Sequence, residues 1–184
     1  MSDEVLKQNK AQPLADGWMK CVERNNFEFP KDFTAHNFGV RVRLKGDLLK
    51  GGDARPQLAL EGDSKSHQLF ISQPKGDDMV IRVYAAKPPP APKTLAQVVL
   101  TQPLSKGVEC TLELFAVGQC LIARVNGQTL GALDPDIAAD HLCRPAISNI
   151  SNDHFRDLQI VNLDSLSETE VLKSLDLLPD VTQE

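Results

Sequence analysis

The chain has 184 residues and a formal net charge of −5 at pH 7, with 41% hydrophobic and 24% charged residues. This is an ordinary globular composition, and the length suits a single domain with its own hydrophobic core. The acidic balance argues against a nucleic-acid-binding protein, which normally carries a basic patch. No apolar run is long enough to cross a bilayer, so we expect no membrane insertion.

The first twelve residues are polar and show no periodic pattern, which predicts a disordered lead-in over 1–12. This segment also lacks the apolar core of a signal peptide. The missing apolar core and the cysteine pattern described below slightly favour a cytoplasmic location. A secreted parent protein stays open as an alternative if this is an excised domain.

From residue 13 to residue 164 the chain shows short strand patterns separated by turn residues. Val40, Val42 and Leu44 alternate with Arg41 and Arg43, which is the period-2 pattern of a half-buried strand. Turn signals recur about every 8–12 residues, as is typical of an all-β sandwich or barrel. Further strand patterns lie at 57–61, 68–71, 79–84 and 96–101.

The segment 108–133 predicts a meander of three strands. Alternation places one set of side chains on one face (Cys110, Leu112, Leu114, Ala116) and a second set on the other (Glu109, Thr111, Glu113). With a turn near Gly118, Cys120 is expected opposite Ala116. Asn126-Gly127 suits a type I′ turn, because both residues tolerate a positive φ.

The last segment, 165–184, predicts a short helix followed by a tail. Ser167 and Glu170 have the spacing of a capping box, in which each side chain bonds the other residue's backbone N–H. An apolar stripe follows and Pro179 ends it, so we expect about three turns that dock on the domain or on a neighbour.

The proline-rich run 87–93 cannot join a sheet. We interpret it as a stiff loop between two strands. The alternative is a polyproline II ligand for a proline-recognising domain.

The four cysteines, Cys21, Cys110, Cys120 and Cys143, lack the close spacing of zinc or redox motifs. We interpret them as small hydrophobic residues in a reducing compartment. A Cys21–Cys143 bridge stays open as an alternative.

The segment 112–166 resembles a known family. Leu112-Glu113-Leu114, Gly118, the run 123–128 and Leu133-Asp134 are similar to the turn and core motifs of concanavalin A-like, laminin G-like jelly rolls, and 155–164 looks like their closing strand. The tail 163–172 is similar to the end of such domains in large bacterial proteins, where they are accessory to signalling or repeat-containing chains. The chain also resembles a glycoside-hydrolase-like family of unknown function with the same sandwich. These resemblances imply an all-β, antiparallel two-sheet jelly-roll sandwich with a short C-terminal helix.

The sequence contains no convincing motif for catalysis or metal binding. Glycosidases with this sandwich carry Glu-x-Asp-x-x-Glu on a strand, whereas Glu61-Gly62-Asp63 is followed by Ser66 and reads as a turn. The pairs Asp140-His141 and Asp153-His154 read as surface loops rather than metal ligands. We therefore expect no catalytic residues, no metal site and no cofactor. The resemblance leaves calcium as an alternative, with oxygens from Asp134, Asp136 and Asp140 or from Asp77 and Asp78.

The remaining functional signal is a binding surface. Arg41, Arg43, Arg82 and Tyr84 are the candidate binding residues, provided that their strands are neighbours. The low aromatic content of 5% favours a protein contact over a strong glycan site. Trp18 is expected in the core, with a platform for a sugar ring as the alternative. The sequence thus predicts a non-catalytic binding or accessory module that contacts protein or carbohydrate, with a glycoside-hydrolase-like enzyme and a purely structural domain as alternatives.

Overall fold

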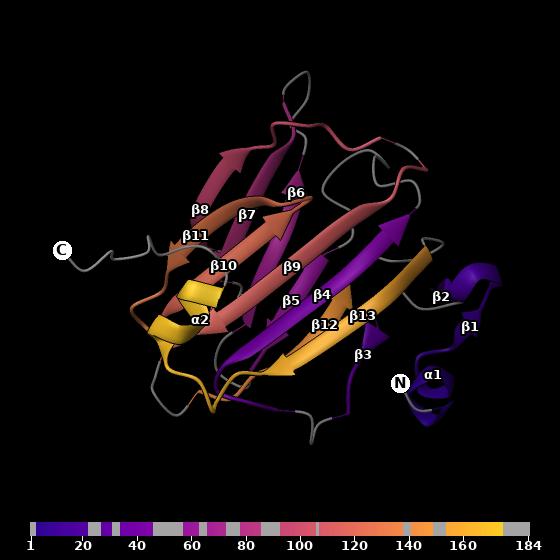
Figure 1. The fold of residues 1–184 in the computed structure, drawn as a ribbon, viewed down its shortest axis with the longest axis horizontal. Helices are drawn as coiled ribbons and strands as arrows, with labels where there is room; N and C mark the ends of the chain where they lie inside the picture. Colours follow the sequence, from indigo (N-terminus) through magenta and orange to yellow (C-terminus); the bar gives the residue numbers. More distant parts are fainter. Residues whose placement is uncertain are drawn as a thin grey trace.

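The protein is a sandwich of two antiparallel sheets in the computed structural model (Figure 1), which describes residues 3–21, 27–30, 34–45, 57–62, 66–72, 78–85, 93–105, 107–137, 141–148 and 154–174. Within these residues, seven strands form sheet A in the order β1-β2-β13-β4-β9-β10-β11 and six form sheet B in the order β3-β12-β5-β6-β7-β8. The predicted all-β jelly-roll architecture is confirmed.

The strand bounds follow the alternating patterns closely. Sheet A contains β1 (Ala11–Pro13), β2 (Met19–Cys21), β13 (His154–Asn162), β4 (Phe38–Lys45), β9 (Cys110–Val117), β10 (Cys120–Val125) and β11 (Gln128–Leu133). Sheet B contains β3 (Phe27–Glu28), β12 (Arg144–Ser148), β5 (Gln57–Glu61), β6 (Ser66–Ser72), β7 (Val80–Ala85) and β8 (Lys93–Val99).

The core lies between the two sheets and is built from every second residue of each strand. Val40, Val42 and Leu44 of β4 are at most 1% exposed, while the arginines between them face away from sheet B. Leu69 of β6 and Ile81 of β7 meet them from the other sheet. Burial of such side chains contributes about 25 cal/mol per Å² of apolar surface removed from water, which is the main stabilising term of the sandwich.

The meander β9–β10–β11 confirms both predicted turns but corrects the register of the first. Asn126 and Gly127 have φ angles of 49° and 86°, as a type I′ turn requires. Gly118-Gln119 is a two-residue turn, so Cys120 pairs with Val117 and not with Ala116. This difference of one residue moves every cross-strand neighbour of β10.

The ends of the chain carry two short helices. The lead-in 1–12, expected to be disordered, instead contains α1 (Asp3–Gln8) and most of β1, which pairs with β2. Asn9 holds it in place, because its side chain donates to the carbonyl of Glu28 and accepts from the N–H of Glu28. Local pattern could not reveal this bond, since its partners are 19 residues apart.

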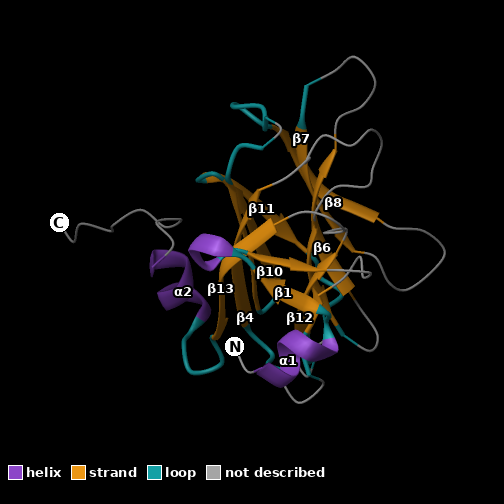
Figure 2. Ribbon diagram, turned by 90° about the vertical axis from the view of Figure 1, so that its right-hand side faces the viewer, coloured by secondary structure: helices purple, strands orange, loops and turns teal. Residues whose placement is uncertain are grey.

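The C-terminal helix α2 (Glu168–Ser174) begins at the predicted capping box. The Ser167 hydroxyl accepts from the backbone of Glu170 at 3.3 Å, and the Glu170 carboxylate accepts from the backbone of Ser167 at 2.8 Å. Val171 packs on Val117 and Leu163, so α2 lies on the side of sheet A that faces away from sheet B (Figure 2). The predicted third turn lies outside the described residues.

Some predictions fall on residues that the structure does not describe, namely most of the proline-rich run 87–93 and the acidic residues Asp63, Asp77, Asp140 and Asp153. Among the described helices, none is long and apolar enough to span a membrane.

Candidate functional site: the outer face of sheet A

The four candidate binding residues lie on two different sheets. Arg41 and Arg43 belong to β4 in sheet A, and Arg82 and Tyr84 belong to β7 in sheet B. All four alternate with core residues, so each pair points outward from its own sheet. The condition that their strands be neighbours is therefore not met, and the structure brings together two pairs rather than one surface.

The pair on sheet B forms a compact, half-buried contact. Arg82 Nη1 donates to the Tyr84 hydroxyl at 3.4 Å, and the Tyr84 ring meets the ring of Phe70 edge-on at a centroid distance of 5.7 Å. Phe70 also lies on the outer side of sheet B, yet it is only 5% exposed. The polar groups of this part of sheet B therefore lie beside a buried aromatic ring.

Arg41, one residue of the pair on sheet A, belongs to a row of polar side chains that crosses five neighbouring strands. We call it the polar row: Thr129 of β11, Arg124 of β10, Glu113 of β9, Arg41 of β4 and Gln159 of β13. Each member is the direct cross-strand partner of the next. Because paired residues in antiparallel strands share a face, the row forms one continuous line on the outer side of sheet A.

Hydrogen bonds and ion pairs hold part of this row in place. Arg124 Nε donates to the Thr129 hydroxyl at 3.0 Å. Arg41 Nε lies 3.8 Å from Glu113 Oε1, an ion pair too long for a hydrogen bond. The side chain of Arg41 is 41% exposed, whereas that of Glu113 is 17% exposed. Arg41 is therefore the more exposed member of this ion pair.

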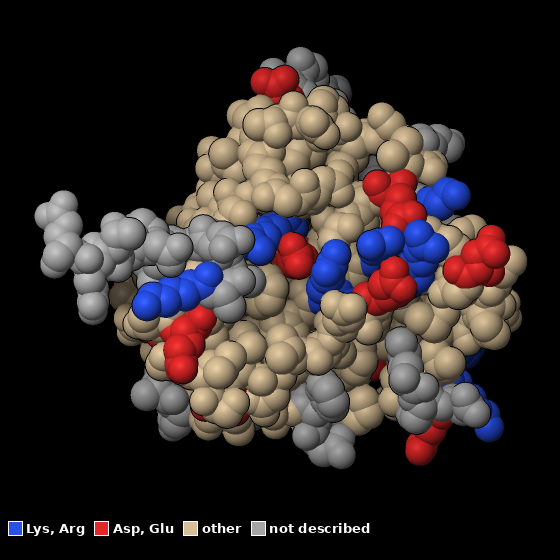
Figure 3. Space-filling view, in the orientation of Figure 1, with Lys and Arg blue, Asp and Glu red and all other residues tan. Residues whose placement is uncertain are grey.

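A cavity of about 150 Å³ adjoins Arg41, and its lining combines polar and apolar groups. Arg41, Glu113 and Gln159 supply donors and acceptors, while Phe115 and Val161 supply apolar surface. Ligand sites commonly pair a largely apolar wall with a few convergent polar groups, although this cavity is smaller than a typical drug-sized pocket. Figure 3 shows the charged side chains as a band across a hollow in the middle of this face.

Gly39 lets the apolar side of this cavity form. A Cβ placed on Gly39 would lie 2.6 Å from the Phe115 ring and 2.8 Å from Cγ1 of Val161. Both distances are shorter than side-chain contacts allow, so any larger residue would displace the ring. The absence of a side chain at Gly39 therefore allows Phe115 to lie close to the strand next to Arg41.

Beyond the polar row, a cluster of ion pairs continues across the face. We call it the arginine–carboxylate cluster: Arg43, Glu109, Arg156 and Asp157. Arg156 Nη2 donates to Glu109 at 2.8 Å and Arg43 Nη1 donates to the same carboxylate at 3.2 Å. The hydrogen bond from Arg156 is the largest cause that lowers the pKa of Glu109 below its ordinary value of 4.5. Glu109 therefore stays ionised and is a poor proton donor.

Trp18 lies at the edge of this cluster and not in the core, contrary to the sequence prediction. The guanidinium of Arg156 sits 4.5 Å from the centre of the Trp18 ring, and Lys45 Nζ sits 5.9 Å from it. Trp18 is half-buried, and it directly precedes β2, which pairs with β13. Cation–π contacts of this kind hold the indole at the end of the charged face.

The other end of the face is apolar and closed by α2. Val117 and Leu163 point outward from sheet A but are buried against Val171 of the helix. The outer face of sheet A thus changes along its strands from a helix-covered apolar end, through the polar row, to the charged cluster beside Trp18.

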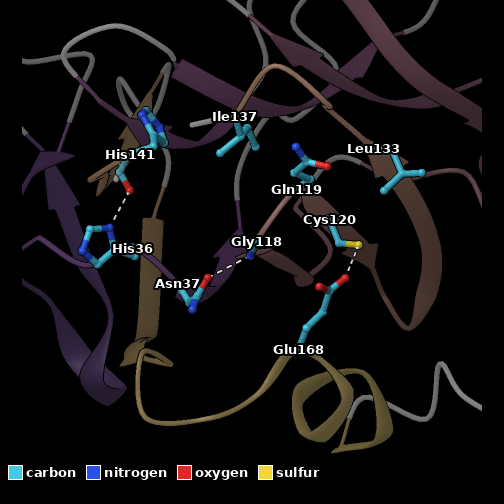
Figure 4. A pocket seen from close by; sticks show the side chains of 9 residues that line it. All are labelled: His36, Asn37, Gly118, Gln119, Cys120, Leu133, Ile137, His141 and Glu168. Carbon is cyan, nitrogen blue, oxygen red and sulfur yellow. Dashed lines mark hydrogen bonds between the residues drawn. The ribbon is translucent and has the colours of Figure 1, made fainter. Parts of the chain in front are cut away.

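A second, larger cavity of about 430 Å³ opens at the end of the sandwich, next to α2 (Figure 4). His36 and Asn37 line one side, and Gly118, Cys120 and Glu168 line another. Its polar groups are largely engaged with one another. The Cys120 thiol donates to Glu168 at 2.9 Å, the Asn37 side chain accepts from the N–H of Gly118 at 2.8 Å, and His36 contacts the carbonyl of His141.

The cysteines are four free thiols, three of them buried, so no Cys21–Cys143 bridge is present. Burial raises the pKa of the Cys110 and Cys143 thiols to about 12, and burial with Glu168 nearby raises that of Cys120 to about 11. These groups remain protonated at neutral pH and are poor nucleophiles and poor metal ligands.

Asp134, a candidate calcium ligand, already uses its carboxylate in contacts within the protein. The Asp134 carboxylate is 2% exposed, lies 2.8 Å from the His67 ring and accepts from the backbone of Asp136 at 3.1 Å. Among the described residues, no group of three or more acidic, histidine or cysteine side chains is placed to hold a metal. Asp134 therefore does not fit a calcium ligand, and it serves instead to tie the turn after β11 to β6.

Comparisons with known proteins identify the architecture. No protein family model matches the chain, and no curated protein matches it. Among solved structures, the chain is similar to the carbohydrate-binding module CBM66 from Bacillus subtilis, with a TM-score of 0.55 and 10% identity over 82% of this chain and 89% of that one. It is also similar to domain 4 of the extracellular GH43 arabinanase AbnA from Geobacillus stearothermophilus, in complex with arabinotriose, with a TM-score of 0.54 and 10% identity over 82% of this chain and 73% of that one.

A protein of unknown function from Saccharomyces cerevisiae has a TM-score of 0.53 and 12% identity over 83% of this chain and 91% of that one. At these identities the similarity concerns the fold, which is the concanavalin-like jelly-roll sandwich. A shared fold of this kind does not by itself carry a function.

Sequence reasoning missed most residues of this face, among them Trp18, Glu113 and Arg124. The signal for Glu113 and Arg124 was present, because both alternate with core residues in the meander. The expected register placed Arg124 opposite Leu112, whereas the two-residue turn places it opposite Glu113. Trp18 gave no such signal, since its neighbours Arg156 and Lys45 are distant in sequence.

Proposed function

We propose that this protein is a non-catalytic carbohydrate-binding module that holds its ligand on the outer face of sheet A. The observation that carries the proposal is the polar row beside the 150 Å³ cavity, where Arg41, Glu113 and Gln159 converge next to the apolar surface of Phe115. A sugar ring has hydroxyl groups around its edge and an apolar face, so it matches a surface of this composition.

The structural neighbours support the same ligand class. One of them is a carbohydrate-binding module, and another is a domain in complex with arabinotriose. The fold is common to many functions, so this support is by analogy and is secondary to the site itself.

The electrostatics of the face favour binding over hydrolysis. A retaining or inverting glycosidase needs one carboxyl group with a raised pKa to protonate the leaving oxygen. Glu109 has a lowered pKa because Arg156 and Arg43 bind it, and Glu113 lies beside Arg41. These arginines hold the carboxylates as fixed acceptors for sugar hydroxyls.

The test is a glycan array followed by calorimetry on the best ligand. We expect Arg41→Ala to weaken binding about tenfold, since one hydrogen-bonding side chain contributes about 0.5–1.5 kcal/mol. Arg82→Ala is the matched control, because it removes the same side chain from the outer face of sheet B. Absence of any glycan signal, or equal losses from both variants, would contradict the proposal.

A further inference from the structure

The distribution of charge on the outer face of sheet A indicates which carbohydrates it would select. On β13, β4, β9, β10 and the adjoining Glu109, the outward side chains include five cations and three carboxylates in the described residues (Arg41, Arg43, Lys45, Arg124, Arg156; Glu109, Glu113, Asp157). The chain as a whole has a net charge of −5. This face is therefore locally cationic in an acidic protein.

The excess of two positive charges comes from Lys45, which lies over Trp18, and from the polar row. In the arginine–carboxylate cluster, two arginines lie with two carboxylates, so that part is balanced. In the polar row, Arg41 and Arg124 lie on either side of a single carboxylate, Glu113. An anion placed against this row beside the cavity would meet the half-exposed guanidinium of Arg41.

The geometry of Arg41 fits such an anion. Its Nε lies 3.8 Å from Glu113 Oε1, its terminal nitrogens form no hydrogen bond with the described residues, and the side chain is 41% exposed at the edge of the cavity. A guanidinium presents its donors as a planar fork that binds a carboxylate or a sulfate in a bidentate manner. Gln159, the cross-strand partner of Arg41, adds an amide on the other side.

We propose that the site is selective for sugars that carry a negatively charged substituent, a carboxylate or a sulfate, bound by the terminal nitrogens of Arg41. This inference rests on the proposed carbohydrate function and adds the substrate class. Glu113 lies beside the bound anion and repels it, which limits the affinity, while it still accepts bonds from sugar hydroxyls.

The experiment compares short ligands that differ in charge alone. Trigalacturonic acid is titrated against its methyl ester, and a sulfated lactose is titrated against lactose, each by calorimetry at low and high salt. We expect the charged member of at least one pair to bind about 10- to 100-fold more tightly, because a hydrogen bond to a charged group contributes about 1.5–3 kcal/mol. This preference should shrink at high salt, since exposed charges are screened.

Three variants assign the effect to the polar row. Arg41→Gln should abolish the preference for the charged ligand, and Glu113→Gln should strengthen binding of the charged ligand while it weakens binding of the neutral one. Arg82→Gln on sheet B should leave the binding of both the charged and the neutral ligand unchanged. Thermal unfolding of each variant checks that the fold is retained.

The outcomes separate this inference from the function on which it rests. Equal binding of the charged and neutral members, with loss in Arg41→Gln, would overturn the charge selectivity and leave the carbohydrate module in place. Binding of no member of either pair, together with an empty glycan array, would overturn both. A preference that Arg82→Gln abolishes and Arg41→Gln does not would overturn the placement on sheet A. Preference for the carboxylate pair or for the sulfate pair tells which anion the site takes.

Discussion

The outer faces of the two sheets each carry one pair of the predicted binding residues, but the surroundings of the pairs differ. On sheet A, Arg41 lies beside a cavity and is 41% exposed. On sheet B, Arg82 contacts Tyr84, and Phe70 beside them is 5% exposed. The same alternating pattern therefore gives half-buried ion pairs beside a cavity on one sheet and a half-buried contact with aromatic rings on the other. Alternation identifies an outward side chain, and its cross-strand neighbours decide whether its polar atoms can meet a ligand.

The largest expected effect is on stability, at the buried contact between His67 and Asp134 that links the two sheets. His67 of β6 and Asp134 after β11 are both at most 2% exposed, and their side chains meet at 2.8 Å, so they join sheet B to sheet A. His67→Ala removes the partner of a buried carboxylate and should lower the free energy of unfolding by about 3 kcal/mol or more in urea denaturation.

The affinity of the folded fraction for a ligand should stay the same in this variant, because His67 points into the sandwich. His154→Ala is the control, since His154 is half-buried beside Trp18 at a ring distance of 6.5 Å. A decrease of less than about 1 kcal/mol in the free energy of unfolding of His67→Ala would show that the His67–Asp134 contact contributes little to stability.

At Gly39 of sheet A, one substitution should change both stability and ligand binding, because both depend on the position of the Phe115 ring. Gly39→Ala should lower the free energy of unfolding by about 1–3 kcal/mol and weaken ligand binding, because the new Cβ displaces Phe115 from the cavity. Denaturant unfolding and calorimetry measure the two effects.

Gly131→Ala is the matched control for Gly39→Ala. Gly131 lies in the same cross-strand row as Gly39, through Ile122 and Phe115, and nothing lies within 4 Å of its added Cβ. This control should be neutral or slightly stabilising. A loss of the same size at both glycines would point to backbone propensity rather than to a clash with Phe115.

A smaller effect is expected at the apolar end of sheet A, which α2 covers. Ser167→Ala removes the hydroxyl that accepts from the backbone of Glu170 and should cost about 1 kcal/mol of helix stability. Hydrogen exchange at Val171 should increase, whereas exchange within sheet B should not. Ser165→Ala, two residues earlier and also exposed, is the control. Unchanged exchange at Val171 would show that packing on Val117 and Leu163 holds α2 without its cap.

The smallest effect is a pH dependence confined to the charged end of sheet A. The pKa of Glu109 is lowered chiefly by its hydrogen bond from Arg156, so the contribution of this carboxylate to stability is present above its unfolded value near 4.5 and is lost as the pH falls through the lower folded value. Protonation of Glu109 releases Arg156, which contacts Trp18, the single tryptophan of the chain.

Trp18 fluorescence should therefore change below pH 4.5, and Glu109→Gln should remove that transition. A transition of equal size in the variant would assign it to another acid.

Local sequence predicted the parts of the structure whose partners are close in the chain. The alternation of Val40, Val42 and Leu44 gave the buried face of β4, and Asn126-Gly127 gave the hairpin turn. Ser167 and Glu170 gave the start of α2. Each of these depends on backbone geometry or hydrogen bonds within a few residues.

The candidate site was predicted only in part, because its composition depends on which strands are neighbours. Arg41 and Arg43 were predicted together with Arg82 and Tyr84, but the two pairs do not share a surface, because β4 and β7 belong to different sheets. Glu113 and Arg124 were hidden by an error of one residue in the register at Gly118. A turn residue narrows the register of a hairpin, but the packing of one face against a core fixes it.

The sequence by itself determined that this protein is an antiparallel sandwich and which side chains point out of it, because hydrophobic periodicity is a local property of a strand. Only the tertiary structure decided which outward side chains share a surface. Trp18 meets Arg156, which lies 138 positions further along the chain, and Arg41 meets Glu113, which lies 72 positions further along. Contacts of this kind arise from sheet order, which is selected by burying all the strands in one core and not by any single segment.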